Sequence, residues 1–356
     1  MMQLAEIIQA ALGDGTVSSA SDIHLVYGLP PRIRRDGRLT DLPGAPPLSD
    51  GECMAYAEEL AGAKQLLELK RMGELDLART YGGVRIRGNV YWQQGHVSCA
   101  VRLLRDAIPA LESLGLPPVV STFPELRRGV VLVTGVTGSG KSTTLAAILQ
   151  RINETRHEHI ITLEDPIEYV YRPQKCTINQ REIGRDTASY ANGLRAILRE
   201  DPDVILIGEM RDLETIEIAL TAAETGHLVF ATLHTASAPD SIDRIVEAFP
   251  TGMQKQIRMQ LSQTLLAVLS QQLLPVAGGV GRICACEVMM VNHAIRNLIR
   301  EGKTPQIANS LATSAEEGSV TMDNTLLRLL AAKIISPETA LKAARDPEQL
   351  SKSIVR

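Results

Sequence analysis

The segment VVLVTGVTGSGKSTT, residues 130–144, restricts the possible fold of this chain more than any other stretch. Residues 135–142 match the pattern GxxxxGK[ST]. An apolar run precedes the match and a helix-favouring sequence follows it, which is the context of a phosphate-binding P-loop. The glycines allow backbone N–H groups to surround phosphate oxygens, and the start of the helix adds partial positive charge. The residues expected to bind the nucleotide are Gly135, Thr137, Gly138, Ser139, Gly140, Lys141, Ser142 and Thr143.

Two of these side chains have individual expected roles. Lys141 should reach the β- and γ-phosphates of ATP, and the Ser142 hydroxyl should ligate Mg²⁺. ATP and Mg²⁺ are therefore the expected cofactors.

Apolar strands alternate with helical stretches from residue 129 onward. The runs VVLVTG, HIITLED, DVILIGE and LVFATLH are continuous apolar segments separated by helix-favouring sequence. Such strands are typical of an α/β fold, with a parallel sheet covered by helices on both faces. This second domain is expected to span residues 123–356.

The first 105 residues predict a smaller α+β domain. They contain an amphipathic helix over residues 4–11, a second helix over 52–73, and two alternating strands around a glycine-containing turn over 84–104. The proline-rich residues 106–122 suggest a linker between the two domains.

The amino-acid composition argues against several classes of protein. The net charge is −4 and only 3% of the 356 residues are aromatic, which argues against a nucleic-acid binder. The five cysteines form no CxxC pair, so a reducing compartment fits better than a disulfide framework or a zinc site. The N-terminus lacks a basic signal region, and no run approaches the roughly 18–20 apolar residues that span a bilayer. We expect a cytoplasmic protein that contacts membranes only through partners.

Acidic residues end two of the apolar strands. Glu164 and Asp165 end HIITLED, and Glu209 follows Gly208 at the end of DVILIGE. Ligands of open α/β sheets bind at the carboxyl ends of strands. ATP hydrolysis needs one carboxylate to orient or deprotonate water and another near the magnesium ion. Each acid alone could be a solvated strand end or a helix N-cap, but two such strand ends after one P-loop favour catalysis. How directly Glu209 approaches the metal stays open, because Gly208 stands where a Walker B strand would usually end in Asp.

His234 lies at the C-terminal end of LVFATLH, beside two threonines. A histidine at a strand end is commonly structural. At the strand end nearest the nucleotide it could instead respond to the γ-phosphate.

Five blocks occur in a diagnostic order: GVTGSGKST, ITLEDPIEYV, NQREIGRDT, LRAILREDPDVILIGEMRD and TGHLVFATLHT. In this order they resemble the Walker A, Asp box, Walker B and His box of the bacterial secretion ATPase superfamily of hexameric motors. The resemblance implies a RecA-like C-terminal ATPase domain, a PAS-like N-terminal domain, and a ring with nucleotide between neighbouring subunits. It also implies Glu164 as the general base, Glu209 as the Walker B acid and His234 as the nucleotide-responsive residue.

The family takes charge-neutralising arginines from its N-terminal domain. The matching positions in this sequence are Arg87 and Arg102, on adjacent predicted strands. Arg195, Arg199 and Arg211 lie within the ATPase core and compete for the same role.

Two absences and one motif indicate the retraction branch of this superfamily. The chain lacks both the long extra N-terminal region and the tetracysteine insert typical of assembly and type II secretion ATPases. The block AIRNLIREGK, residues 294–303, matches the motif of pilus retraction ATPases. The expected protein is a homohexameric ATP-hydrolysing motor for type IV pilus retraction at the cytoplasmic face of the inner membrane. Its expected partners are a membrane platform protein directly and the pilin fibre indirectly.

Other functions remain open. Within the same class, the chain could be an accessory retraction paralogue, or the motor of another pilus-like or type II secretion system. The net negative charge argues against a nucleic-acid translocase. The presence of Lys141, Glu164 and Glu209 argues against a non-catalytic ring.

The block AIRNLIREGK itself predicts an amphipathic helix. Ile295, Leu298 and Ile299 should share a buried face, and Gly302 should end the helix. On its polar side, Arg296 and Arg300 are candidates for force transmission.

Overall fold

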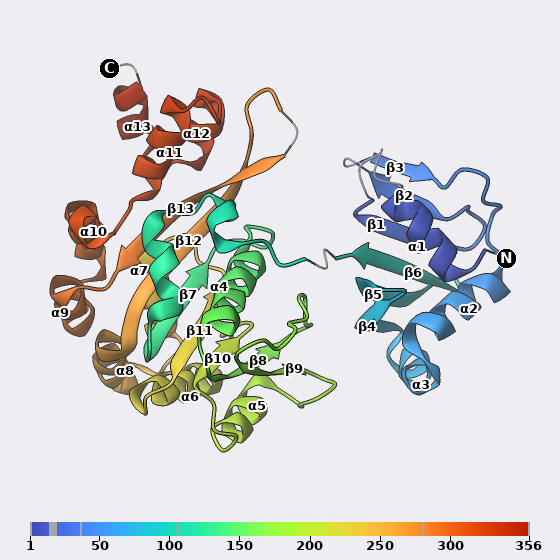
Figure 1. The fold of residues 1–356 in the computed structure, drawn as a ribbon, viewed down its shortest axis with the longest axis horizontal. Coiled ribbons are helices and arrows are strands. Elements are labelled where there is room, and N and C mark those ends of the chain that lie inside the picture. Colours follow the sequence, from blue (N-terminus) through green and yellow to red (C-terminus); the bar gives the residue numbers. More distant parts are fainter. Residues whose placement is uncertain (1, 14–19, 36–37, 105–106, 280, 355–356) are drawn as a thin grey trace. The chain divides into compact units, whose positions relative to one another are not determined.

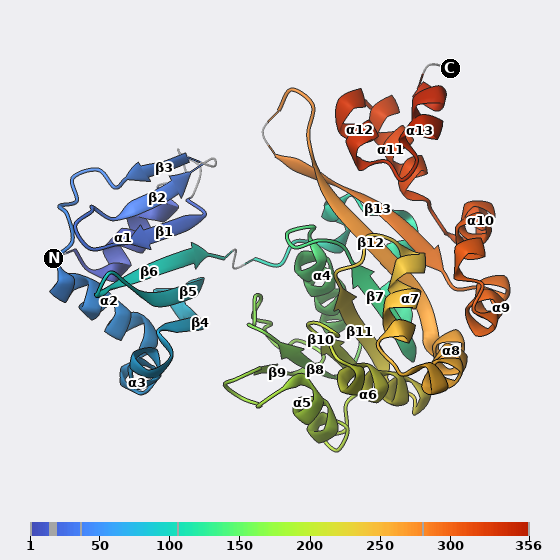
Figure 2. The same ribbon diagram turned by 180° about the vertical axis from the view of Figure 1, so that it is seen from behind.

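The P-loop strand lies inside a mixed seven-stranded sheet of a two-unit chain (Figures 1 and 2). The computed structural model describes residues 2–13, 20–35, 38–104, 107–279 and 281–354. One compact unit comprises residues 1–107 with 166–170, and the other comprises 108–165 with 171–356.

The sheet of the second unit has the order β13-β12-β7-β11-β10-β8-β9. All neighbouring pairs are parallel except β12 and β13, which are antiparallel. The predicted α/β class is confirmed. The strands are β7 (Gly129–Thr134), β8 (His159–Glu164), β9 (Thr177–Glu182), β10 (Val204–Ile207), β11 (Leu228–Leu233), β12 (Leu265–Pro275) and β13 (Arg282–Met290).

Helices pack on this sheet and extend beyond it. The main core joins buried residues of β7, β8, β10 and β11 to helices such as α6 and α8. A second cluster joins α11–α13, which gather near the C-terminus in both views (Figures 1 and 2). The helices are α4 (Lys141–Thr155), α5 (Tyr190–Ile197), α6 (Leu213–Glu224), α7 (Ala238–Glu247), α8 (Thr251–Thr264), α9 (His293–Glu301), α10 (Ile307–Thr313), α11 (Met322–Ala331), α12 (Pro337–Ala343) and α13 (Pro347–Ile354).

The first unit contains a six-stranded antiparallel sheet with the order β3-β2-β1-β6-β5-β4. Apolar residues of α1 and α2, with Leu69 of α3, pack against it in one core. The single helix predicted over residues 52–73 is interrupted at Gly62, whose φ of 78° ends α2 before α3 begins. The elements are α1 (Leu4–Leu12), β1 (Asp22–Leu25), β2 (Arg32–Arg35), β3 (Arg38–Asp41), α2 (Asp50–Ala61), α3 (Ala63–Met72), β4 (Glu74–Tyr81), β5 (Val84–Gln93) and β6 (His96–Leu103).

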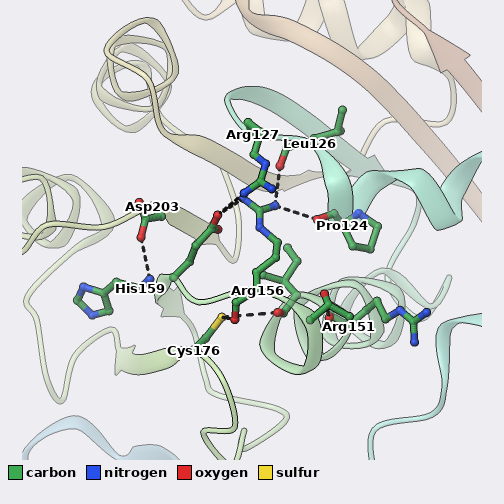
Figure 3. A network of polar contacts seen from close by, with 11 residues as sticks. Pro124, Leu126, Arg127, Arg151, Arg156, His159, Cys176 and Asp203 are labelled. Atoms are coloured by element: carbon green, nitrogen blue, oxygen red, sulfur yellow. Dashed lines mark hydrogen bonds and ion pairs between the residues drawn. The ribbon is translucent and has the colours of Figure 1, made fainter.

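The proline-rich segment suggested as a linker packs onto the second unit from residue 108 onward. It forms two 3₁₀ helices, Leu111–Leu114 and Pro118–Glu125. The buried Arg156 guanidinium donates hydrogen bonds to the carbonyls of Pro124 (2.8 Å) and Leu126 (2.6 Å) and pairs with Glu158 (Figure 3). A buried charge is tolerated only when it is paired and hydrogen-bonded, so this network ties the end of the second 3₁₀ helix and the residue after it to the end of α4.

The helix α9 confirms the amphipathic prediction for residues 294–303. Asn292 caps its N-terminus by accepting from the Ile295 N–H, and Gly302 ends it with a φ of 71°. Ile295 and Ile299 are fully buried, and Leu298 packs partly buried beside them.

The polar side of α9 is only partly available to a partner. The Arg296 guanidinium donates to the carbonyls of Ser262 (2.7 Å) and Gln263 (2.9 Å), at the end of α8. Because the last carbonyls of a helix have no partner within the helix, Arg296 acts as a C-terminal cap for α8. Arg300 is exposed and donates to Asn297 in the same helix. Arg296 therefore has a structural role that its spacing did not indicate.

Replacing Arg296 should destabilise the second unit. We expect Arg296→Ala to lower the free energy of unfolding by about 1–3 kcal/mol, since two carbonyls lose a charged donor. The measurement is urea unfolding followed by circular dichroism. The matched control is Arg300→Ala, which should change the free energy by less than about 0.5 kcal/mol. Equal effects of the two substitutions would contradict the capping role.

Candidate active site

The P-loop has a backbone that only glycine can adopt at its first position. Gly135 follows β7 with a φ of 136°. A Cβ there would lie 2.3 Å from the Gln271 carbonyl oxygen and 2.6 Å from Ser139 Oγ. The loop therefore turns sharply against β12 and leads directly into α4.

The start of α4 has no side-chain cap. Its N-cap residue is Gly140, which offers no side-chain oxygen to the first N–H groups. Ser139 is buried, and its Oγ has no hydrogen-bond partner among the described residues. Uncapped N–H groups and an orphaned hydroxyl beside a helix N-terminus fit a bound phosphate. The other predicted side chains of the loop, Thr137, Ser142 and Thr143, are exposed or half-buried around this opening.

The Lys141 side chain packs against the backbone of the P-loop. Its Nζ donates to the carbonyls of Gly135 (2.7 Å) and Val136 (3.1 Å), and the residue is only 9% exposed. The ammonium group therefore lies against the phosphate cradle, as a phosphate-binding lysine must.

Parallel pairing brings the two acidic strand ends together. Leu163 of β8 pairs with Ile207 of β10, so Glu164 and Gly208 follow at the same level. The Gly208 N–H also donates to the Leu163 carbonyl (2.7 Å). Glu164 Oε1 accepts hydrogen bonds from the Thr162 hydroxyl (2.7 Å) and the Gln180 amide (3.1 Å). Neighbouring strands thus fix the position of the Glu164 carboxylate.

Glu209 is held by two basic side chains. Its Oε2 lies 2.7 Å from Arg211 Nη2, and its Oε1 lies 3.2 Å from His234 Nε2. Burial alone would raise the pKa of the Glu209 carboxyl, but Arg211 and His234 hold it below its usual value. The carboxylate is therefore ionised at neutral pH, and the structure joins His234 directly to it.

Close packing explains the glycine that replaces the usual Walker B aspartate. A Cβ on Gly208 would lie 2.8 Å from Tyr190 Oη, 3.1 Å from the Leu163 carbonyl and 3.3 Å from Glu164 Cα. A side chain there would have to displace the Tyr190 hydroxyl, and the acid instead lies one residue later, at Glu209. Tyr190 is a site residue that sequence reasoning missed, because only the packing of α5 brings its ring here.

The candidate arginines of the first unit lie side by side. Arg87 of β5 and Arg102 of β6 are direct cross-strand partners, and Asp22 of β1 lies opposite Arg102 on its other side. Arg102 Nε donates to Asp22 Oδ1 (2.9 Å). Within the described parts of the chain, the Arg87 side chain has no hydrogen bond or ion pair. The Arg102 guanidinium is therefore paired with a carboxylate, whereas the Arg87 guanidinium is paired with none that the structure describes.

The competing arginines of the second unit occupy different settings. Arg195 forms an ion pair with Glu214, and Arg199 is exposed after α5. Arg211 contacts the candidate acid Glu209 itself.

No group of three or more His, Cys, Asp or Glu side chains in the described ranges could hold a metal ion. A magnesium ion carried by nucleotide phosphates needs no such cage, because one or two protein oxygens complete its shell. The exposed Ser142 hydroxyl and the ionised Glu209 carboxylate are suitable oxygens of this kind. In the part of the chain that the structure describes, no helix has the length and hydropathy required to cross a bilayer.

Comparison with known proteins gives a consistent result. Residues 117–278 match the family model described as type II/IV secretion system protein. The type IV pilus retraction ATPase PilT of Pseudomonas aeruginosa is 45% identical over 98% of this chain and 99% of its own length. The type IV pilus ATPase PilU of the same organism is 36% identical over 93% of this chain and 86% of its own length. The crystal structure of the pilus retraction motor PilT with bound ADP superposes with a TM-score of 0.92 and 47% identity, covering 99% of this chain and all of that one.

This similarity extends across both units and includes the P-loop and its acidic strand ends. The chain belongs to the PilT-like type IV pilus retraction ATPases, within the type II/IV secretion system protein family.

Proposed function

We propose that the chain is one subunit of a homohexameric motor that hydrolyses ATP to retract type IV pili. The observation that carries this proposal is the placement of Glu164, Glu209 and His234 at the carboxyl ends of β8, β10 and β11, which follow the P-loop strand on one side of the sheet. The full-length similarity to a pilus retraction ATPase supports the biological output.

The residues of this chain divide the chemistry of hydrolysis. The P-loop N–H groups and Lys141 bind the phosphates. Ser142 and Glu209 would hold Mg²⁺, and the ion would neutralise charge on the phosphates. Glu164 accepts a proton from the attacking water as the water oxygen bonds to the γ-phosphorus. The bond from phosphorus to the bridging oxygen breaks, and ADP and phosphate leave.

His234 links this chemistry to the rest of the unit. Its hydrogen bond to Glu209 responds to changes in charge at that carboxylate, and α7 begins four residues later with Ser237 as its N-cap. We assign His234 the role of sensing the nucleotide.

The arginines of the first unit supply positive charge to a neighbouring subunit. In a ring with nucleotide between subunits, Arg87 and Arg102 neutralise charge on the transferred phosphoryl group. The antiparallel sheet of the first unit and the helices packed on it support the proposed PAS-like domain.

The partners and location follow from the retraction role. The hexamer acts at the cytoplasmic face of the inner membrane, where it engages a membrane platform protein and acts on the pilin fibre indirectly. Direct nucleic-acid binding is not part of this function. The similarity to PilU supports one alternative, an accessory retraction ATPase.

Glu164→Gln tests the general base. The amide keeps the shape of the side chain and cannot accept the proton, so we expect ATP hydrolysis to fall by about 10²–10⁴-fold with little loss of ATP affinity. The measurements are steady-state phosphate release and equilibrium binding of a fluorescent ATP analogue. The control is Glu154→Gln, on α4, which should leave both unchanged. Normal hydrolysis by Glu164→Gln would move the base role to Glu209.

Mixing inactive subunits tests whether the arginines act across subunits. Arg87→Ala and Arg102→Ala should each lower hydrolysis by about 10³-fold or more. Mixing either variant with Lys141→Ala subunits should restore activity, because the second subunit supplies an arginine to the intact P-loop of the first. If the mixtures stay as inactive as their components, the arginines do not act in trans.

Deletion of the gene tests the biological output. Cells without the protein should carry excess surface pili that do not retract, which electron microscopy and twitching assays would show. Bald cells would indicate a motor for assembly, and an unchanged phenotype would favour the accessory role.

A further inference from the structure

The hydroxyl group of Tyr190 lies between the two acidic strand ends. Its oxygen occupies the space that a side chain at residue 208 would need, 2.8 Å from an ideal Cβ position. Gly208 adjoins Glu209 in sequence and lies beside Glu164 across the paired strands. The phenol oxygen is therefore placed where the general base and the Walker B acid meet.

The packing of α5 fixes this placement. Ser189 caps the helix by accepting from the Asn192 N–H, and Tyr190 is the first helical residue. A Cβ on Gly193 would lie 2.8 Å from Leu163 Cδ2, so the helix approaches β8 as closely as a glycine allows. Leu194 and Ile197 are fully buried in the same core. Tyr190 thus has little freedom to turn away.

The Tyr190 hydroxyl makes no hydrogen bond to any residue that the structure describes, so no such partner accounts for its position. Burial, with the negative charges of Asp165 and Glu209, raises its pKa well above the usual value. The group therefore stays protonated at neutral pH, able to donate one hydrogen bond and to accept another. A polar group that faces carboxylates beyond direct bonding distance commonly meets them through water.

We propose that Tyr190 positions the water that attacks ATP. The water donates one hydrogen to Glu164, which will take that proton, and its other hydrogen to Tyr190 Oη. With both hydrogens engaged, a lone pair is directed at the γ-phosphorus. The tyrosine keeps its own proton throughout, so the proton balance of hydrolysis is unchanged. This assignment rests on the proposed role of Glu164 and adds a second residue to it.

Tyr190→Phe removes the hydroxyl and keeps the ring that packs beside Gly208. In the full-length protein we expect kcat for ATP hydrolysis to fall about tenfold, which corresponds to about 1.4 kcal/mol of transition-state stabilisation. KM for ATP, the affinity for a fluorescent ATP analogue and the midpoint of thermal unfolding should stay at wild-type values. A purely structural tyrosine would instead change the unfolding midpoint or affect kcat and KM together.

Tyr56→Phe is the matched control. That hydroxyl belongs to the first unit and donates to the Met2 carbonyl (2.7 Å), so its removal should leave kcat unchanged. Measuring Glu164→Gln in the same assay separates two failures. If Glu164→Gln is inactive and Tyr190→Phe hydrolyses ATP at the wild-type rate, the role of Tyr190 is wrong and that of Glu164 stands. If Glu164→Gln is fully active, the base assignment itself is wrong.

Discussion

The parallel hydrogen-bond register of β7, β11, β10 and β8 is the constraint on which the whole site depends. Thr134 pairs with Leu233, so the P-loop and His234 begin at the same level. Ile207 pairs with Ala231 on one side and Leu163 on the other, which brings Gly208 and Glu164 to the same edge. The ends of these four strands thus place the phosphate loop, the histidine and both acids at one edge of the sheet, although they are far apart in sequence. A slip of one residue would point each strand's side chains to the opposite face and separate the set.

The same register packs the site closely, and at two positions glycine avoids the close contacts that a Cβ atom would make. At Gly135 the loop runs against the Gln271 carbonyl, and at Gly208 the Tyr190 hydroxyl and the Leu163 carbonyl occupy the space of a side chain. The second case has a chemical consequence. Because the acid is displaced to Glu209, its carboxylate meets Arg211 and His234, which hold its pKa below the usual value. Close packing thus disfavours a side chain at residue 208, and the contacts with Arg211 and His234 keep the Glu209 carboxyl ionised.

Features that depend on the local chain could be predicted from the sequence, and features that depend on packing could not. The P-loop, the α/β class and the amphipathic face of α9 follow from residue spacing, and Glu164, Glu209 and His234 follow from their places at strand ends. The helix break at Gly62 cannot be predicted from the sequence, because the helical periodicity of apolar residues continues on both sides of it. Spacing places Arg296 on the polar face of its helix but does not indicate that it caps a helix more than 30 residues earlier in sequence. Tyr190 gave no signal, because its position depends on how closely Gly193 lets α5 approach Leu163.

Contacts beyond the strand edge restrict how a change at His234 can propagate. The chain passes from His234 through Ser237, which caps α7, and the Ala238 N–H then donates to Glu287 Oε1 on β13 (3.0 Å). Glu287 is buried, which raises the pKa of its carboxyl, and Arg345, just before α13, lies 3.5 Å from its other oxygen. Moving the start of α7 alone would remove a partner from this buried carboxyl, at a cost of about 1–3 kcal/mol. Glu287 therefore links the start of α7 to β13 and to the segment that carries Arg345.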